Sequence, residues 1–209
     1  REILQQNKVL VNIRQASVKK ILSELKALSE NDKEKYAEFV KEFNRPLKEG
    51  LYSDYLNRDA ILELVRFKSS LADGYVSLAE YKGRMKEGQK AIYYLTGGDE
   101  KRLRGSPLLE AYKRENIEVL IMDDEIDGIV ISGVPRYQDL ELKAINQAGA
   151  DEELGGKKDK AAEKDMKGLT DRLKKILGQA VKDVRVSSRL ADPPACVVTD
   201  KDDPGMQMR

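Results

Sequence analysis

Apolar residues recur at helical spacing over the first part of the chain. They predict a long amphipathic helix that runs to about Leu28. Its apolar stripe consists of Leu4, Val11, Val18, Leu22 and Leu25. Asn31 and Asp32 interrupt the pattern, and this pair can cap a following helix.

Two further helices are predicted before residue 69. The apolar face of the second consists of Tyr36, Phe39, Val40 and Phe43, whose three aromatic rings we interpret as core. Pro46 stops this helix or bends its exit. Asn57 can cap a third helix, whose apolar positions are Ile61, Leu62 and Val65.

A strand–helix–strand pattern follows. Ser77 and Glu80 have the spacing of a capping box. The apolar run 92–95 predicts a strand that ends in the turn Thr96-Gly97-Gly98. Ser106 followed by Pro107 is a strong signal for the start of a helix, which ends near Asn116.

The next strand is predicted to be buried on both faces. Residues 117–122 are apolar except for Glu118. Because parallel strands need a crossover rather than a hairpin, this run and the run 92–95 predict a parallel pair. A short helix at about 126–131 follows, and Leu140 and Leu142 alternate with charge as an edge strand.

The composition changes after residue 145. Residues 146–165 are rich in Gly, Ala and charged residues, which predicts a charged linker or a long loop. Apolar positions then predict a helix, closed by Gly178, that carries Met166, Leu169, Leu173 and Ile176. Val184 and Val186 alternate with charge as a strand, with which residues 195–198 can pair.

These elements predict an α/β and α+β protein. We expect residues 1–145 to form one domain, with a three-helix coil over 1–68 and a small αβα unit with a short parallel sheet over 69–145. The linker 146–165 then leads to residues 166–209, the start of a truncated α+β domain. Because Arg1 begins inside a helical pattern without an initiator methionine, we expect the sequence to be a piece of a longer protein.

Composition narrows the class of protein. The 38 basic and 37 acidic residues nearly cancel, which argues against a dedicated nucleic-acid surface. The single cysteine, Cys196, cannot form an internal disulfide, and no apolar run approaches the length that spans a bilayer. We therefore expect a cytoplasmic protein.

The sequence offers little catalytic chemistry. It has no histidine, the commonest general base and zinc ligand, and we expect no metal site within the chain. We interpret Cys196 as a buried small hydrophobe and the pair Asp123-Asp124 as a helix cap. Neither Thr96-Gly97-Gly98 nor Gly155-Gly156-Lys157 completes a phosphate-binding motif.

The first helical turn holds one candidate binding pair. Arg1 and Gln5 are one turn apart and share a face, so a guanidinium and an amide could reach the same phosphate group. Taken alone, this spacing is more typical of two solvated surface residues.

Several segments, in order along the chain, resemble the ninety-kilodalton heat-shock chaperones. Arg1 to Lys8 is similar to their catalytic-loop-to-helix segment, and 92–97 to a middle-domain strand and turn. The following helix and strand match at 106–111 and 118–120, and the D-x-I-D motif matches at 124–127. Residues 184–187 and 194–196 resemble the start of the carboxy-terminal domain, and the spacing favours the bacterial HtpG branch.

The resemblance implies an ATP-driven clamp that assists protein folding. By this resemblance, Arg1 would contact the γ-phosphate of ATP held with Mg²⁺ on the amino-terminal domain, and Gln5 would support it. The nucleotide pocket lies outside this chain, so the fragment alone is expected to bind no cofactor and to be inactive. The intact parent would be an ATPase.

The resemblance also implies partners. In related proteins the helix after D-x-I-D carries an aromatic residue implicated in contact with unfolded or partly folded clients. Here the corresponding positions are Gly128 and Ile129, with Ser132 one turn on. The parent would be a homodimer, but the helices that close the dimer lie beyond Arg209. No contact with nucleic acid or membrane is expected.

Two alternatives belong to other classes of protein. One is a free-standing interaction or scaffold module without nucleotide coupling. The other is a small flavodoxin-like enzyme that uses the turn Thr96-Gly97-Gly98, which we rank last because no acid–base partner accompanies the turn.

Overall fold

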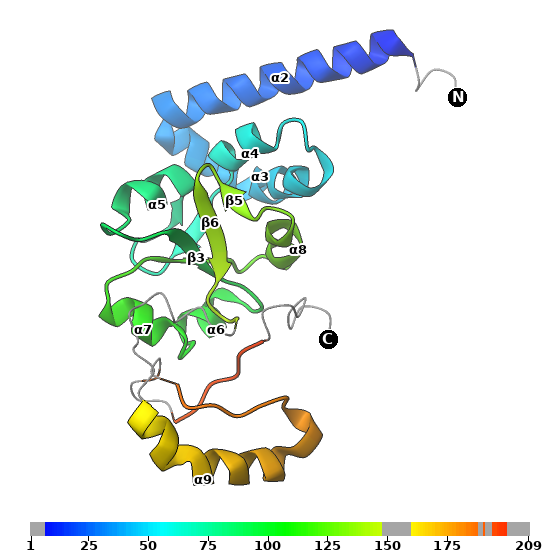
Figure 1. The fold of residues 1–209 in the computed structure, drawn as a ribbon. Coiled ribbons are helices and arrows are strands. Elements are labelled where there is room, and N and C mark those ends of the chain that lie inside the picture. The colour runs from blue at the N-terminus through cyan, green and yellow to red at the C-terminus, as the bar shows by residue number, and fades with distance from the viewer. Residues whose placement is uncertain (1–6, 148–159, 188–189, 191–193, 200–209) are drawn as a thin grey trace. The chain divides into compact units, whose positions relative to one another are not determined.

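The fold is that of a computed structural model, which describes residues 7–147, 160–187, 190 and 194–199. Its contacts divide the chain into two compact units. The first comprises residues 1–104 and 118–143, and the second comprises residues 105–117 and 144–209. Helices and strands are labelled in Figure 1.

The first unit begins with a pair of long helices, α2 (Lys8–Asn31) and α3 (Lys33–Ser53). The carboxylate of Asp32 accepts a hydrogen bond from the backbone N–H of Lys35 at 3.0 Å, which confirms the predicted cap. The short helix α4 (Arg58–Leu64) follows. The order of three helices agrees with the sequence prediction.

The apolar stripe of α2 packs only over its second half. Leu22, Leu25 and Leu28 contact a cluster of buried residues formed by Tyr36, Val40 and Leu64. Val11, earlier in the same stripe, is 44% exposed. The long helix is therefore held by its C-terminal half.

The prediction that Pro46 stops α3 is wrong, because the helix continues to Ser53; the alternative, a bend at its exit, stays a prediction. The proline side chain is exposed, whereas the buried face of the helix continues on both sides of it through Val40, Asn44, Lys48 and Leu51. A proline inside a helix removes one backbone hydrogen bond and costs about 3 kcal/mol. Burial of this continuous face offsets that cost.

The aromatic cluster of α3 is only partly core. Tyr36 is buried, and its hydroxyl donates to the carbonyl of Leu64 at 2.6 Å. Phe43 is 53% exposed, although its ring stacks on Phe39 with a centroid separation of 5.2 Å. The interpretation of all three rings as core is therefore wrong for Phe43, which lies at the margin of the buried face.

Asn57 occupies the predicted cap position of α4, but its side chain does not cap the helix. Instead, its amide donates to the carboxylate of Asp54 at 2.7 Å. The bond closes the turn between α3 and α4.

A six-stranded mixed sheet forms the centre of the fold, with the order β2-β1-β4-β3-β6-β5. Its strands are β1 (Phe67–Ser69), β2 (Tyr75–Val76), β3 (Ala91–Leu95), β4 (Val119–Ile121), β5 (Arg136–Tyr137) and β6 (Leu140–Ala144). β3 and β4 are parallel, with Tyr93 opposite Val119, as the sequence predicted. The remaining pairs for which a direction is recorded are antiparallel.

The prediction that residues 140–143 form an edge strand is wrong. β6 lies between β3 and the two-residue strand β5, which forms the edge. The alternation of apolar and charged residues correctly indicated one buried face. It could not reveal a neighbour as short as β5.

Two of the helices between the strands, α5 and α8, begin close to their predicted positions, whereas α6 was not predicted. Ser77 and Glu80 form the predicted capping box at the start of α5 (Leu78–Arg84). Strand β3 leads into α6 (Glu100–Arg104), and α8 (Asp127–Ser132) follows β4. The predicted short helix at about 126–131 therefore agrees with α8 to within one residue.

In the second unit, α7 (Leu109–Arg114) begins two residues after the predicted position of Pro107. Ser106 accepts a hydrogen bond from the backbone N–H of Leu108 at 3.3 Å within a turn that precedes the helix. Asn116 ends the segment with a φ of 51°, a left-handed conformation that asparagine tolerates better than most residues. This agrees with the predicted helix end.

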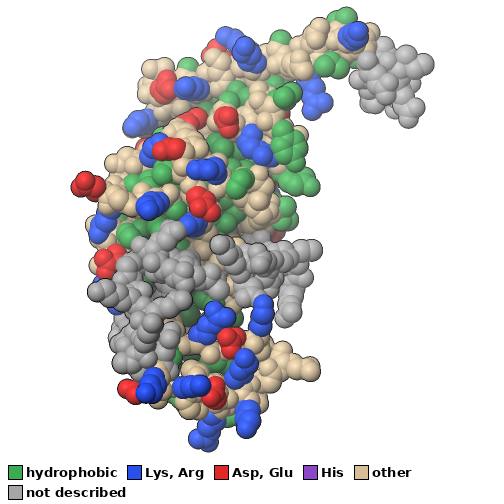
Figure 2. Space-filling model, in the orientation of Figure 1, with side chains coloured by type: hydrophobic (Ala, Val, Ile, Leu, Met, Phe, Trp, Pro, Cys, Tyr) green, Lys and Arg blue, Asp and Glu red, His purple; other side chains and the backbone are tan. Residues whose placement is uncertain are grey.

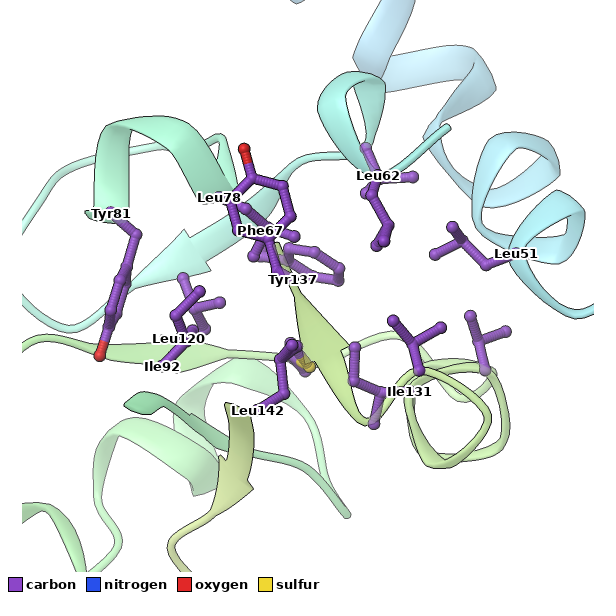
Figure 3. Packing of buried hydrophobic residues seen from close by; sticks show 14 of the residues in the cluster. Leu51, Leu62, Phe67, Leu78, Tyr81, Ile92, Leu120, Ile131, Tyr137 and Leu142 are labelled. Carbon is purple, nitrogen blue, oxygen red and sulfur yellow. The ribbon is translucent and has the colours of Figure 1, made fainter. Parts of the chain in front are cut away.

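The core of the first unit lies around the sheet and the inner faces of α3, α4, α5 and α8. Figure 3 shows Leu51, Leu62 and Ile131 on one side of this cluster, and Tyr81 on the other. Residues that are distant in sequence therefore meet in one continuous apolar core.

The second unit also contains α9 (Lys160–Leu177) and a 3-10 turn over Gly178–Ala180. The helix begins six residues before Met166, where the linker was predicted to end. Gly178 has a φ of 52° and ends the helix as predicted. Residues 148–159 of the predicted linker lie outside the described residues.

The strand predicted at Val184 and Val186 is not formed, because the described residues 181–187 contain no strand. The recorded pairing in this region is a single bridge between Gln147 and Thr199. Two alternating valines indicate an extended backbone but do not provide a partner strand.

The prediction that Cys196 is buried is also wrong, because its side chain has intermediate exposure.

Basic and acidic side chains lie interspersed on the face of the molecule that Figure 2 shows. This distribution agrees with the nearly equal numbers of basic and acidic residues in the chain. In the part of the chain that the structure describes, no helix is both long and apolar enough to cross a bilayer.

We expect the substitution Pro46→Ala to stabilise the protein. Alanine restores the missing backbone donor of α3, and the exposed position creates no clash. The expected gain is about 2 kcal/mol in the free energy of unfolding, after allowance for the greater freedom of the unfolded chain. Urea unfolding measures this difference. The exposed neighbour Glu42 provides the control, because Glu42→Ala should change stability by no more than about 0.5 kcal/mol. A loss of stability in Pro46→Ala would contradict the expectation.

Candidate functional site

The predicted phosphate-binding pair, Arg1 and Gln5, lies outside the described residues. The described chain begins at Asn7, whose side chain accepts a hydrogen bond from the backbone N–H of Val9 at 2.9 Å. Asn7 therefore caps the start of α2. The role of Arg1 and Gln5 remains a prediction.

The three predicted client-contact residues lie on α8, which is a short helix with one exposed apolar side chain. Ile129 is 60% exposed, whereas its neighbours Val130 and Ile131 are buried in the core. Gly128 is buried, and Ser132 is exposed and donates to the carbonyl of Ile129 at 2.7 Å. Only Ile129 therefore offers apolar surface to a partner.

α8 is joined to α3 by a buried ion pair. The ammonium of Lys48 lies 2.6 Å from Oδ1 of Asp127, and the two side chains are 4% and 1% exposed. The second oxygen of Asp127 accepts from the backbone N–H of Asp124 at 3.2 Å. A charge buried to this degree is stable only with such partners.

Burial dominates the protonation of Asp127. Loss of solvation raises the pKa of its carboxyl above the ordinary value, while the close ammonium of Lys48 acts in the opposite direction. The net effect is a raised pKa of Asp127. The ammonium of Lys48 therefore offsets part of the free-energy cost of keeping this buried carboxylate charged.

The two acidic residues after β4, Asp123 and Asp124, make different contacts. Asp124 accepts a weak hydrogen bond from the backbone N–H of Ile126 at 3.4 Å and lies 3.7 Å from the guanidinium of Arg45. Asp123 instead accepts from Lys68 at 2.6 Å. Only Asp124 therefore takes part in the turn before α8, which corrects the interpretation of both residues as a helix cap.

Lys68 bridges two carboxylates. Its ammonium lies 2.6 Å from Asp123 and 2.6 Å from Glu100. Partial burial acts to lower the pKa of Lys68, but the hydrogen bonds to Asp123 and Glu100 outweigh this effect and raise the pKa. The bridge links β1, the end of β4 and the start of α6.

An open pocket of about 210 Å³ lies beside these charges. Its lining combines apolar side chains with charged side chains of both signs. The lining residues are Val40, Lys41, Glu42, Asn44, Arg45, Lys48, Phe67, Lys68, Tyr75, Ile121, Asp123 and Asp124. The pocket is smaller than a typical site for a drug-sized ligand. Four basic and three acidic side chains line the pocket, so its charge favours neither an anionic nor a cationic ligand.

A second buried charge lies at the other end of β4. Glu118 is 5% exposed, and its carboxylate accepts from the guanidinium of Arg84 at 2.8 and 2.9 Å and from the hydroxyl of Ser69 at 2.6 Å. These bonds tie α5 and β1 to the start of β4. Bidentate contacts between arginine and a carboxylate are among the strongest polar contacts in proteins.

The hydroxyl of Tyr81 joins the two parallel strands. It donates to the carbonyl of Glu118 at 2.6 Å and accepts from the backbone N–H of Tyr93 at 3.0 Å and from the amide of Gln89 at 3.1 Å. Burial raises the pKa of Tyr81. The hydroxyl therefore stays protonated and available as a donor over the physiological pH range.

Sequence reasoning did not identify Lys48 or the buried role of Glu118. A signal for Lys48 was present, because Val40, Asn44, Lys48 and Leu51 have the spacing of one buried helix face. For Glu118, a signal was also present, because a single charge in a strand predicted to be buried on both faces needs a partner. The identity of that partner, Arg84, depends on tertiary structure.

The glycine turn after β3 leads into a short helix. Gly97 has a φ of 99°, which closes the turn, and the following helix α6 has five residues. A side chain at Gly98 would lie 3.0 Å from Cδ of Arg102. The second glycine motif, at 155–157, lies outside the described residues. Among the side chains that the structure describes, no group of three or more His, Cys, Asp and Glu could hold a metal ion.

Comparisons with known proteins agree on one family. A family model described as "Hsp90 protein" matches residues 1–209. "Chaperone protein HtpG" of Treponema denticola is 55% identical over 216 residues, which cover 100% of this chain and 34% of that protein. "Chaperone protein HtpG" of Wolinella succinogenes is 54% identical over 210 residues, with coverage of 100% and 34%. The chain thus spans about a third of the length of these relatives.

The fold of this chain is also similar to that of a solved heat shock protein structure. The middle domain of a putative heat shock protein from Plasmodium falciparum has a TM-score of 0.63 and 34% sequence identity to this chain. The match covers 67% of this chain and 58% of that one.

We expect the substitution Lys48→Met to make stability depend on pH. It leaves the carboxylate of Asp127 buried without its cation, which costs about 3 kcal/mol or more at neutral pH. A buried Asp whose pKa is raised in the folded state is relieved of this cost when it takes up a proton. The deficit relative to the wild type should therefore shrink as the pH falls through the folded-state pKa of Asp127.

Urea unfolding at pH 7.5 and at successively lower pH tests this expectation. Lys41→Met, which removes an exposed cation from the same helix, is the control and should follow the wild type at each pH. An equal deficit of Lys48→Met at every pH would contradict the assignment of the charge to Asp127.

Proposed function

We propose a role in an ATP-dependent molecular chaperone for this chain, which belongs to the Hsp90 protein family and, within it, to the bacterial HtpG branch. The observation that carries this proposal is the identity of 55% across the whole chain with a protein named as a chaperone. The chain corresponds to about a third of such a protein, so we propose that it couples nucleotide state to client binding.

The proposed nucleotide contact is made by Arg1. A guanidinium offers fixed donors that fit a phosphate group in a bidentate way, and an amide one turn away can add a further hydrogen bond. In this proposal Arg1 stabilises the negative charge that develops on the γ-phosphate during hydrolysis, and Gln5 supports it. ATP, with Mg²⁺ to neutralise part of its charge, would bind mainly on a neighbouring domain.

The proposed client contact is made by α8. Ile129 presents an exposed aliphatic side chain on an element whose other large side chains are buried. An apolar group on a well-anchored helix can bind an unfolded polypeptide without a large loss of its own conformational freedom. By the same family relationship, we propose that the intact protein is a cytoplasmic homodimer and an ATPase.

We expect the substitution Arg1→Ala in the full-length protein to lower ATP turnover steeply. Loss of one donor to the developing charge typically costs about 100-fold in rate. Steady-state phosphate release measures the change, and ATP binding should fall much less than turnover. Lys8→Ala, at the exposed first residue of α2, is the control and should leave the rate unchanged. Wild-type turnover in Arg1→Ala would remove the catalytic assignment.

We expect the substitution Ile129→Asp to weaken the binding of an unfolded model client. It places a charge on the exposed apolar position of α8 and leaves the core side chains in place. Loss of one aliphatic contact and desolvation of the new carboxylate should lower affinity about tenfold. Fluorescence anisotropy with a labelled, reduced and alkylated protein measures the affinity.

Val11 provides the control for this experiment. It is an exposed aliphatic residue on α2, so Val11→Asp tests for a general effect of an added surface charge. Equal losses of affinity in both variants, or none in Ile129→Asp, would argue against α8 as a client surface.

A further inference from the structure

α8 is a short helix whose own hydrogen bonds do not fix its rotation relative to the rest of the first unit. It has six residues, fewer than an isolated helix needs for stability, and Ile126 at its N-cap makes no side-chain cap bond. The side-chain bonds at its ends, from Ser132 to the carbonyl of Ile129 and from the N–H of Asp124 to Asp127, stay within the helix and the turn before it. Gly128, its second residue, adds backbone freedom. The orientation of α8 must therefore be set by its contacts with the rest of the first unit.

Apolar packing alone distinguishes poorly between orientations of α8. Ile129, Val130 and Ile131 are consecutive branched aliphatic residues. Rotation of the helix about its axis would exchange the exposed Ile129 for the buried Ile131, which is chemically identical. Burial is non-directional and proportional to area, so the two orientations would gain similar hydrophobic free energy.

The Asp127 carboxylate removes this ambiguity. Only an orientation that turns Asp127 inward brings it within 2.6 Å of the Lys48 ammonium. A rotated helix would leave one or both charges buried without a partner, a large penalty. A buried polar pair can therefore select one orientation from several that apolar packing tolerates.

Lys48 is itself held in place. Its ammonium lies 5.0 Å from the centroid of the Phe67 ring and 3.8 Å from Asp124. One turn earlier on α3, the side chain of Asn44 bonds both the N–H and the carbonyl of Arg66, at 3.0 and 2.8 Å. The cation therefore stands on a helix that is fixed to the strand region of the first unit.

We propose that Lys48 is a positioning residue for α8. Through its ion pair with Asp127, Lys48 fixes the rotation of α8 about its axis. This rotation determines that Ile129, rather than Ile131, faces the client. This inference rests on the proposed function for its consequence, client binding. The rotation of α8 is a separate structural claim and is tested separately.

Thiol labelling in the full-length protein measures the rotation directly. Ile129→Cys and Ile131→Cys are each made with Lys48 and with Lys48→Met, and the labelled peptides are quantified by mass spectrometry. With Lys48 present, the thiol at position 129 should react at least about tenfold faster than the thiol at position 131, because reactivity follows exposure. In Lys48→Met the two rates should converge.

Arg84→Met is the matched control. It leaves the buried carboxylate of Glu118, directly before β4, without its cation. The loss is comparable to the loss of Lys48 beside Asp127. This variant should keep the labelling ratio of α8, even if its melting temperature falls as far as that of Lys48→Met. If Lys48→Met does not fold, Lys48→Gln, which retains a hydrogen-bond donor, provides the same comparison.

Two outcomes would overturn the proposal. The first is an unchanged labelling ratio in the folded Lys48 variant. The second is an equal fall of the ratio in Arg84→Met, which would show only general loosening. A normal affinity for client in Ile129→Asp would count against the proposed function alone, because the labelling ratio does not depend on any client.

Discussion

The first unit depends on one constraint, which is that each charge inside its core must meet an opposite charge. Glu118, a buried carboxylate, lies directly before the central strand β4, and a second one, Asp127, begins the helix α8 that follows this strand. Arg84 from α5 satisfies the first, and Lys48 from α3 satisfies the second. Since a lone buried charge costs several kcal/mol, the first pair connects α5 to the start of β4, and the second connects α3 to α8. The apolar core supplies the bulk of the stability, and the ion pairs specify which helix lies where.

Local signals in the sequence predicted the elements that local chemistry determines. The capping box at Ser77 and Glu80 and the cap at Asp32 are formed as expected, because each involves residues three positions apart. The parallel pair of β3 and β4 was also predicted, because the helical segment between them excludes a hairpin. Each of these inferences needed only a short stretch of chain.

Predictions failed where distant contacts decide the outcome. Pro46 remains within α3 because the helix face around it is buried, and β6 is not an edge because the two-residue strand β5 pairs with it. For the candidate site, the resemblance predicted Ile129 as a client contact, but the sequence alone could not show that its side chain is exposed. The partnership of Lys48 with Asp127 spans 79 positions of sequence, and no local pattern could indicate it.

The hydroxyl of Tyr81 has a consequence for the way the sheet bears load. It occupies the space between the N–H of Tyr93 and the carbonyl of Glu118, on two parallel strands that no hairpin joins. If one strand slid past the other by a residue, the hydroxyl could not keep both backbone partners. The side chain of Tyr81, which comes from α5, therefore opposes sliding of β3 along β4. A force applied along one of these strands should be transmitted to the other without a shift of their register.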